Sequence, residues 1–297
     1  MSNWEDIFTL WSKGPDDAER RKIENTEFQI KEAIKVSEKL NRRNIKVFVQ
    51  GSYRNNVNVR QDSDIDIGVL CYDTFFPEYQ DDNIKSHFSR LQESATYTYS
   101  TFKNELGDAL VSRFGNTNVK RGKKAFNIKE NRYRIEADVC TFFEHRRYAS
   151  TEKYLSGVEM IPDDNNPPNI INWPEQHYEN GVSKNTITSR RYKRVVRIMK
   201  KLTYELQPNY DIAKKIPSFL MECLIWNVPN KYFSYETYYQ TIREIIIFLY
   251  NNTKEDKDCS EWGEVSELKY LFRPSQPWSR QLVNEYLLIA WKYIGYK

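Results

Sequence analysis

The sequence predicts an α+β protein of two lobes, in which a mixed sheet with helices is followed by a lobe made of helices. Three observations support this class. Apolar, β-branched runs that end at turn residues are confined to the first half, helical periodicity dominates the second half, and 297 residues approach the size at which one hydrophobic core stops growing. We therefore expect a core over residues 1–165, a helical lobe over 166–297, and an active site in the cleft between them.

The first half of the chain alternates helical and strand patterns. Residues 17–40 place isoleucines at helical spacing without Gly or Pro, which predicts one long leading helix. The run IKVFVQ at 45–50 predicts a buried strand, and DIDIGVLC at 64–71 predicts a second one. Residues 81–113 have a helical pattern. Three short strands are then expected, separated by turns at Gly115, Gly122 and Asn131.

The second half begins with a loop. Residues 161–185 are rich in Pro and Asn, which predicts irregular structure, and HYENG lies within this stretch. Almost everything after it has helical period. The predicted helices cover residues 187–207, 217–228, 234–250 and 279–293.

Composition excludes several classes of protein. Lys and Arg number 45 against 41 Asp and Glu, so the net charge of +4 does not indicate obligate coating of DNA or RNA. An apolar fraction of 39% excludes a disordered chain. The N-terminal residues MSNWEDIFTLW do not resemble a signal peptide, no apolar run is long enough to span a membrane, and the four cysteines form no CxxC pair. We expect a cytoplasmic protein without membrane contact.

Acidic residues alternate with apolar ones on two of the predicted strands. In DSDIDIGVL, the two-residue period of a strand puts Asp64 and Asp66 on one face, and in RIEADVCTFF it puts Glu136 and Asp138 on one face. Carboxylates so close together repel each other unless a cation lies between them, and oxygen ligands suit Mg²⁺ or Mn²⁺. Asp64, Asp66 and Asp138 are therefore candidate ligands for two metal ions, the arrangement that nucleotidyl transfer requires.

A candidate phosphate site precedes the acids. A strand that ends at Gly51 and Ser52 exposes backbone N–H groups and a hydroxyl to an anion. A DxD pattern alone is more often an ordinary surface strand, and a Gly-Ser turn alone is common. The order of glycine turn, paired acids and a third acid on a later strand makes the combined pattern specific.

These motifs resemble those of the polymerase-β-type nucleotidyltransferases, and the chain from about residue 20 to 295 is similar to the bacterial CD-NTases (cGAS/DncV-like), the relatives of cyclic GMP-AMP synthase and oligoadenylate synthase. The segments TSRRYKRVVRIMKKL at 188–202 and IPSFLMECLIWNVP at 216–229 are typical of the helical lobe in this family. The resemblance implies a polymerase-β-like core with a helical lobe. It also implies two Mg²⁺ or Mn²⁺ ions, NTP substrates, and a separate effector activated by a cyclic product.

The resemblance also implies roles for single residues. Asp64, Asp66 and Asp138 would be catalytic metal ligands, with Asp138 also placed to orient or deprotonate the acceptor 3′-hydroxyl. The donor triphosphate would be held by Gly51, Ser52, Lys200 and Ser218, and Phe219 would stack on a base.

Simpler interpretations exist for the residues of the helical lobe. The segment 190–201 carries seven Lys or Arg interrupted by apolar residues, which predicts a helix with one packed and one basic face. Such a basic face can simply be solvated. Ser218 after Pro217 can cap a helix instead of contacting phosphate. Phe219 can belong to the core. Along the whole chain, His87, His145 and His177 are isolated and are interpreted as structural or surface residues.

Base recognition rests on three further residues. Asn180, expected in a loop, resembles an asparagine that favours uracil in the E clade (CdnE-like) of the family, and an amide can donate to O4 and accept from N3–H. Gln276 and Trp278 match the (R/Q)xW pattern of pyrimidine-using members. A loop asparagine can also serve only to form a turn, and Trp278 can be an anchor.

We interpret the sequence as that of a cyclic di- or oligonucleotide synthase, which joins NTPs, UTP and ATP among them, and releases pyrophosphate. Its product would be c-di-UMP or cyclic UMP-AMP, a second messenger for antiphage signalling of the CBASS type. One alternative is a template-independent enzyme that tails RNA or tRNA, against which the near-neutral charge argues because stable RNA or DNA binding is not expected. The other is a catalytically inactive nucleotide-binding module, against which the presence of all three acids argues.

Overall fold

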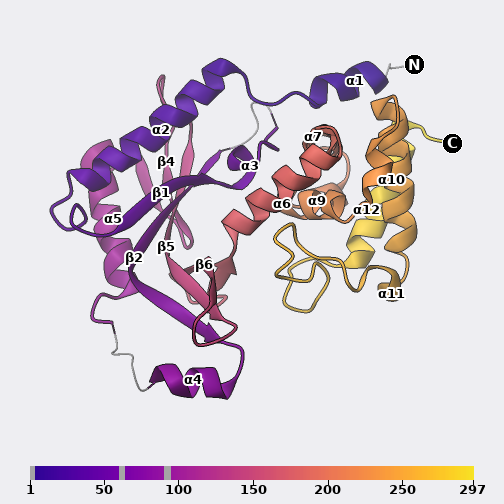
Figure 1. Cartoon of the computed structure of the whole chain (residues 1–297). Helices are drawn as coiled ribbons and strands as arrows, with labels where there is room; N and C mark the ends of the chain where they lie inside the picture. The colour runs from indigo at the N-terminus through magenta and orange to yellow at the C-terminus, as the bar shows by residue number, and fades with distance from the viewer. Residues whose placement is uncertain (1–3, 60–63, 90–94) are drawn as a thin grey trace. The chain divides into compact units, whose positions relative to one another are not determined.

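A computed structural model describes residues 4–59, 64–89 and 95–297 of the chain (Figure 1). The chain forms two compact units, each with its own hydrophobic core. The core unit consists of Asp16–Arg54 and Asp64–Pro174, and the helical unit of Met1–Pro15, Asn55–Ser63 and Glu175–Lys297. Two segments from the N-terminal half, which the sequence placed with the core, thus belong to the helical unit.

A mixed sheet forms the centre of the core unit. Its described strands run in the order β1-β2-β5-β4-β3, with β6 paired to β5 and β7 paired to β6. β2 and β5 are parallel neighbours, and all the other pairs are antiparallel. The strands are β1 (Ile45–Gln50), β2 (Ile65–Tyr79), β3 (Val119–Arg121), β4 (Ala125–Ile128), β5 (Ala137–Tyr148), β6 (Tyr154–Met160) and β7 (Ile170–Asn172).

Two long helices cover this sheet and bury its apolar side chains. α2 (Asp17–Lys35) and α5 (Tyr99–Phe114) pack on each other and on strands of the sheet (Figure 1). The expected alternation holds in the first part of β2, where every second side chain enters the core and is fully buried: Ile65, Ile67, Val69 and Cys71. Shorter helices are α3 (Gly51–Arg54) and α4 (Asp82–Ser89).

Some elements of the core unit differ in length from their predicted ranges. The helix expected over 17–40 ends at Lys35, because a turn then brings Leu40 into the core while Val36 stays 68% exposed. The strand expected over 64–71 continues to Tyr79, since its pairing with β5 resumes after a bulge between Cys71 and Phe75. β6 was not predicted, and neither was β7, which lies inside the expected loop.

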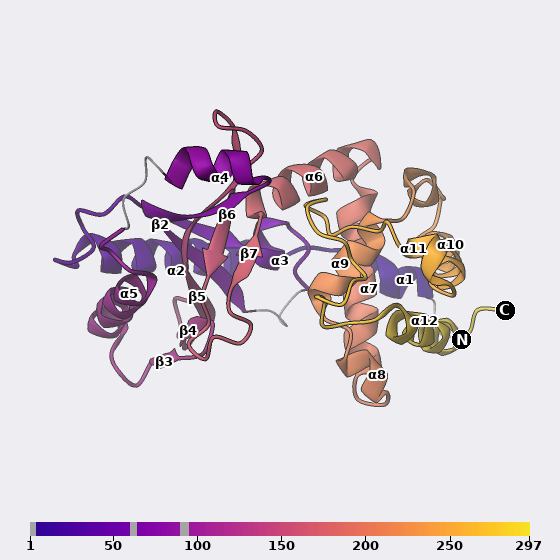
Figure 2. The same cartoon turned by 90° about the horizontal axis from the view of Figure 1, so that it is seen from below.

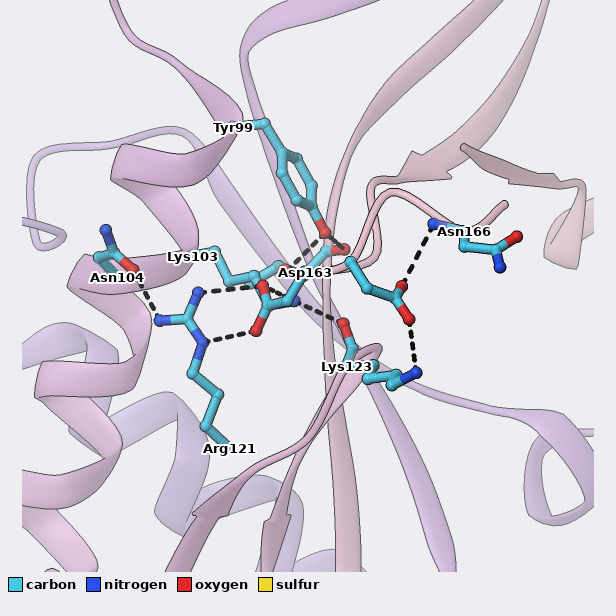
Figure 3. A network of polar contacts seen from close by, with 9 residues as sticks. Tyr99, Lys103, Asn104, Arg121, Lys123, Asp163 and Asn166 are labelled. Carbon is cyan, nitrogen blue, oxygen red and sulfur yellow. Dashed lines mark hydrogen bonds and ion pairs between the residues drawn. The ribbon is translucent and has the colours of Figure 1, made fainter. Parts of the chain in front are cut away.

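A network of charged side chains fixes the loop that follows β6 (Figure 3). Asp163 accepts from Arg121 Nε at 2.8 Å and Nη2 at 3.0 Å, and it pairs with Lys103 Nζ at 2.8 Å. The buried Lys103 also donates to the carbonyl of Lys123 at 2.9 Å. Arg121 donates to Asn104 at 2.7 Å. The network therefore joins α5, the β3–β4 hairpin and the loop within the core unit.

The helical unit is built around α7, which contacts α1, α8, α9, α10 and α12 (Figure 2). Its core also includes Phe8 of α1 and Val57, both fully buried. None of the described helices is both long and apolar enough to cross a bilayer. The elements are α1 (Trp4–Trp11), α6 (Pro174–Ile187), α7 (Arg191–Leu206), α8 (Asp211–Lys214), α9 (Ser218–Trp226), η1 (Asn230–Phe233), α10 (Tyr238–Asn252), α11 (Asp256–Cys259) and α12 (Arg280–Ile294).

The four predicted helices of the second half correspond to α7, α9, α10 and α12, but the loop predicted over 161–185 is wrong in its second part. That part forms α6, whose first residue is Pro174. Proline suits the first turn of a helix because its missing N–H is not needed there. Gly181 lies inside α6 and is buried.

Candidate active site

Two of the predicted catalytic carboxylates lie directly opposite each other in the sheet. Asp66 on β2 and Asp138 on β5 are register partners in the parallel pair, and Asp66 is also the register partner of Gln50 at the end of β1. Asp64 directly precedes β2. Asp138 accepts from Asn127 Nδ2 at 3.2 Å. The core unit thus gathers the three acids at one end of β2 and β5.

The electrostatics of this group fit a cation site. Partial burial, followed by the negative charges of Glu136 and Asp138, raises the pKa of Asp64. Asn127 Nδ2 also donates to Glu136 at 2.9 Å, so one amide bridges two of the carboxylates. Within the described residues, no three His, Cys, Asp or Glu side chains are drawn together tightly enough for a metal. An all-carboxylate set that repels itself nevertheless has the donor chemistry that Mg²⁺ and Mn²⁺ prefer.

Gly51 approaches Asp66 so closely that no other residue fits without displacement. Its φ of +64° lies in the left-handed region. A Cβ built on Gly51 would lie 3.1 Å from Asp66 Cγ and closer still to one carboxylate oxygen. α3, which carries Gly51 and Ser52, is tied to α2 because Tyr53 donates its hydroxyl to Glu19 at 2.7 Å. The predicted glycine turn and the predicted acids are therefore neighbours.

Lys200, the predicted triphosphate ligand of the helical unit, is buried and ion-paired. Its side chain is 3% exposed, and Nζ lies 3.2 Å from Oε2 of Glu222 on α9. The other carboxylate oxygen of Glu222 lies 2.9 Å from Nε2 of His177 on α6. Burial acts most strongly on the pKa of Glu222 and raises it, but electrostatic interactions and hydrogen bonds with Lys200 and His177 together outweigh burial and hold that pKa at about 2.

Part of the basic face expected on α7 is buried, although Arg194 is exposed. Lys193, Arg197 and Lys200 are all buried. Arg197 donates to the carbonyls of Ser12 and Asn56, and burial lowers the pKa of its guanidinium to about 10. The solvated interpretation is therefore wrong for these three residues, because each cation has a partner within the helical unit: the ring of Tyr178 for Lys193, backbone carbonyls for Arg197 and Glu222 for Lys200.

Ser218 and Phe219 begin α9. Pro217 is the N-cap residue, and Ser218 shares a 2.7 Å hydrogen bond with the hydroxyl of Tyr204, so the capping role considered for Ser218 is wrong. Phe219 is 37% exposed, which excludes a purely core role. Its ring centroid lies 5.9 Å from that of His177 and 6.1 Å from that of Trp278, so the three rings form a row.

The predicted base-reading residues Asn180, Gln276 and Trp278 all make hydrogen bonds to residues of the segment 263–278. Asn180 lies on α6 and not in a loop, and its Nδ2 donates to the carbonyl of Val265 at 2.8 Å. Gln276 Nε2 donates to Glu264 at 2.9 Å and to the Tyr270 carbonyl at 3.0 Å. Trp278 Nε1 donates to the carbonyl of Leu271 at 2.8 Å, which is the anchoring role considered for it. The bond from Asn180 ties the segment to α6, and the other three bonds lie within the segment.

Sequence reasoning missed three residues that contact the predicted ones. Glu222 lies four positions after Ser218 in the apolar run SFLMECLIW, and an acid inside such a run is the signal that could have found it. His177 was interpreted as structural or surface, and it is the second partner of Glu222. Asn127 carries no sequence signal of its own.

A mixed sheet with opposed carboxylates beside a glycine turn, followed by a helical unit, defines a nucleotidyltransferase. The family model "Nucleotidyltransferase domain" matches residues 30–228. The model "cGAS/DncV-like nucleotidyltransferase C-terminal helical domain" matches residues 179–295. The chain belongs to the cGAS/DncV-like nucleotidyltransferases, the CD-NTase family, so the predicted family and fold class are confirmed.

Individual relatives resemble the chain over nearly its whole length. A protein of Cecembia lonarensis named cyclic dipyrimidine nucleotide synthase CdnE is 42% identical over 294 residues, with 98% of both chains covered. A protein of the same name from Legionella pneumophila is 42% identical over 297 residues, again with 98% of both covered. The structure of the Elizabethkingia meningoseptica CdnE cyclic dinucleotide synthase with GTP and Apcpp has a TM-score of 0.82 and 34% identity, and covers 98% of this chain and 99% of that one.

Proposed function

We propose that this chain is a cyclic dinucleotide synthase that joins two NTPs and then closes the ring. In each step the 3′-hydroxyl oxygen of one nucleotide forms a bond to the α-phosphorus of a triphosphate, and the bond from that phosphorus to pyrophosphate breaks. The observation that carries this proposal is the register of Asp66 with Asp138 beside Gly51. The 42% identical relatives named as cyclic dipyrimidine nucleotide synthases support the product class.

Asp64, Asp66 and Asp138 would hold two Mg²⁺ or Mn²⁺ ions. Bound there, the ions would neutralise charge on the triphosphate and on the leaving pyrophosphate. Asp138 orients the acceptor 3′-hydroxyl and takes up its proton. The proposed contacts of the donor triphosphate are Gly51, Ser52, Lys200 and Ser218.

We further propose that one or both substrates carry uracil. An amide has two N–H donors and one carbonyl acceptor, and Asn180 gives one N–H to Val265. Its second N–H and its oxygen complement O4 and N3–H of uracil. Gln276 uses both N–H groups on Glu264 and Tyr270, so it offers only its oxygen to a base. Phe219 is the proposed stacking surface. These contacts favour c-di-UMP or cyclic UMP-AMP as the product.

The proposed product is a second messenger that activates a separate effector in the cytoplasm, in antiphage signalling of the CBASS type. This part of the proposal rests on membership of the family.

The test is incubation of the purified protein with Mg²⁺ or Mn²⁺ and each NTP, singly and in pairs, followed by phosphatase treatment and mass spectrometry. We expect a phosphatase-resistant cyclic species that contains uridine and that is absent with Asp66→Asn. A ring made only of purines would keep the reaction and refute the roles of Asn180 and Gln276. Linear oligomers alone would instead indicate a tailing enzyme, and nucleotide binding without any product would indicate a binding module.

A further inference from the structure

We propose that Glu222 is a positioning residue for Lys200. The inference rests on the proposed function, in which Lys200 contacts the β- and γ-phosphates. Glu222 would act through the lysine and would not touch the substrate itself.

The geometry joins three helices at one carboxylate. Glu222 on α9 is 4% exposed, and its two oxygens go to different partners, Lys200 of α7 at 3.2 Å and His177 of α6 at 2.9 Å. An ionised carboxylate only accepts hydrogen bonds, so His177 must donate from Nε2. His177 therefore fixes which way the carboxylate faces, and the second oxygen is left to hold the lysine.

The charge state supports a lasting interaction. A buried carboxylate is costly unless it is paired and hydrogen-bonded, and Glu222 is both. Its pKa of about 2 keeps it ionised throughout the neutral range. A lysine ammonium has three N–H donors on a flexible four-carbon stem. One donor goes to Glu222, which restricts the stem and leaves two donors for phosphate oxygens.

The core unit offers a matched control for a purely structural role. Glu159 is 6% exposed, lies 2.7 Å from Nδ1 of His145, and accepts from Asn169 at 2.8 Å. Like Glu222, it is a buried glutamate shared by a histidine and a second donor. Its contacts include none of the proposed substrate ligands. Glu159→Gln therefore removes a comparable buried charge without touching Lys200.

The experiment compares Glu222→Gln, Lys200→Met, the double variant and Glu159→Gln. Affinity for a non-hydrolysable UTP analogue and for UMP is measured with Mg²⁺ by calorimetry, after circular dichroism has shown that each variant is folded. A hydrogen bond between charged groups contributes about 10- to 100-fold in affinity, so Glu222→Gln should weaken the UTP analogue by about tenfold or more. UMP lacks the β- and γ-phosphates, and its affinity should change by less than about threefold because Lys200 does not contact it.

Two further readouts separate positioning from general damage. If Glu222 acts through Lys200, the double variant binds the UTP analogue no more weakly than Lys200→Met, because the two effects do not add. In turnover, KM for NTP rises while kcat changes little, as expected when uniform binding is lost. Glu159→Gln should bind both nucleotides like the wild type.

Other outcomes would overturn the proposal. It is wrong if Glu222→Gln binds the UTP analogue like the wild type, if UMP weakens equally, or if the double variant shows additive losses. If Glu222→Gln does not fold, His177→Gln takes its place, with a smaller loss expected in the same direction, and unchanged affinity there refutes the proposal. A wild type that binds NTP but forms no product refutes only the proposed function. A wild type that makes product while Glu222→Gln binds normally refutes only this inference.

Discussion

Gly51→Ala tests whether the close approach of the glycine turn to Asp66 matters for catalysis. The substitution adds one methyl group at a position with φ of +64°. It has two separate effects, on the backbone and on the Asp66 side chain, and the structure allows each to be assessed.

The backbone effect is a loss of stability. An L-residue in the left-handed region costs about 1–2 kcal/mol. The steric effect should lower the stability of the fold only slightly, because the methyl group meets the end of the Asp66 side chain, which can rotate away. It is costly for the reaction, since a displacement of about 1 Å in a catalytic group can lower the rate by about 100-fold. We therefore expect modest destabilisation and an approximately 100-fold loss of kcat/KM.

Gly295→Ala is the matched control. Gly295 has φ of +82° at the end of α12, and among the described residues no atom outside its neighbours lies within 4 Å of an added Cβ. Both variants should lose about 1–2 kcal/mol of stability, which corresponds to a fall in Tm of about 2–8 °C and can be measured by calorimetry. Only Gly51→Ala should lose activity, measured as product formed from NTPs. Retention of more than a third of wild-type activity by Gly51→Ala, or an equal loss in Gly295→Ala, would refute the reasoning.

Two further predictions concern ionisable groups outside the proposed site. Hydrogen bonds from Arg121 and Lys103 outweigh burial and lower the pKa of Asp163 from 3.8 to about 2. The contribution of the ionised Asp163 to stability is therefore present above pH 4 and is lost as pH falls towards 2. The urea midpoints of wild type and Asp163→Asn should therefore converge over that range, and a constant gap would contradict this. Burial lowers the pKa of Lys184 to about 8, and Lys184 lines a pocket of about 330 Å³. Its rate of acetylation by acetic anhydride, followed by mass spectrometry, should reach half its maximum near pH 8, whereas Lys39, whose pKa Asp108 raises, should require a pH above 10.

The parts of the site that follow from local periodicity could be predicted from the sequence. A two-residue period was enough to put Asp66 on the opposite face from Ile65 and Ile67. The same reasoning shows which residues of β5 share a face, but it does not give the register that sets Asp138 opposite Asp66. The need for glycine at Gly51 likewise depends on a contact between α3 and the Asp66 side chain of β2. Strand periodicity therefore identified the candidate site residues, whereas their arrangement in space depends on pairing between segments that are distant in the sequence.

The helical unit was harder to predict because its polar groups are satisfied by distant partners. Glu222 lies in an apolar run, and its partner His177 is 45 positions away. Asn180 was placed in a loop because Pro174, Asn180 and Gly181 are all turn formers by propensity. Tertiary packing overrides that preference in α6, where Gly181 is buried and Asn180 bonds to Val265. Composition could not reveal these contacts.

The make-up of the helical unit has a consequence for folding order during synthesis. α1 is translated early, yet Glu5 of this helix accepts from the backbone N–H groups of Tyr238 and Tyr239, across 233 and 234 positions, and Trp4 contacts Tyr293 of α12. α1 therefore cannot complete its contacts until α10 and α12 have left the ribosome, although α7, which it also contacts, is made earlier. The core unit, whose residues end at Pro174, can fold first, and closure of the helical unit by α1 is a late event.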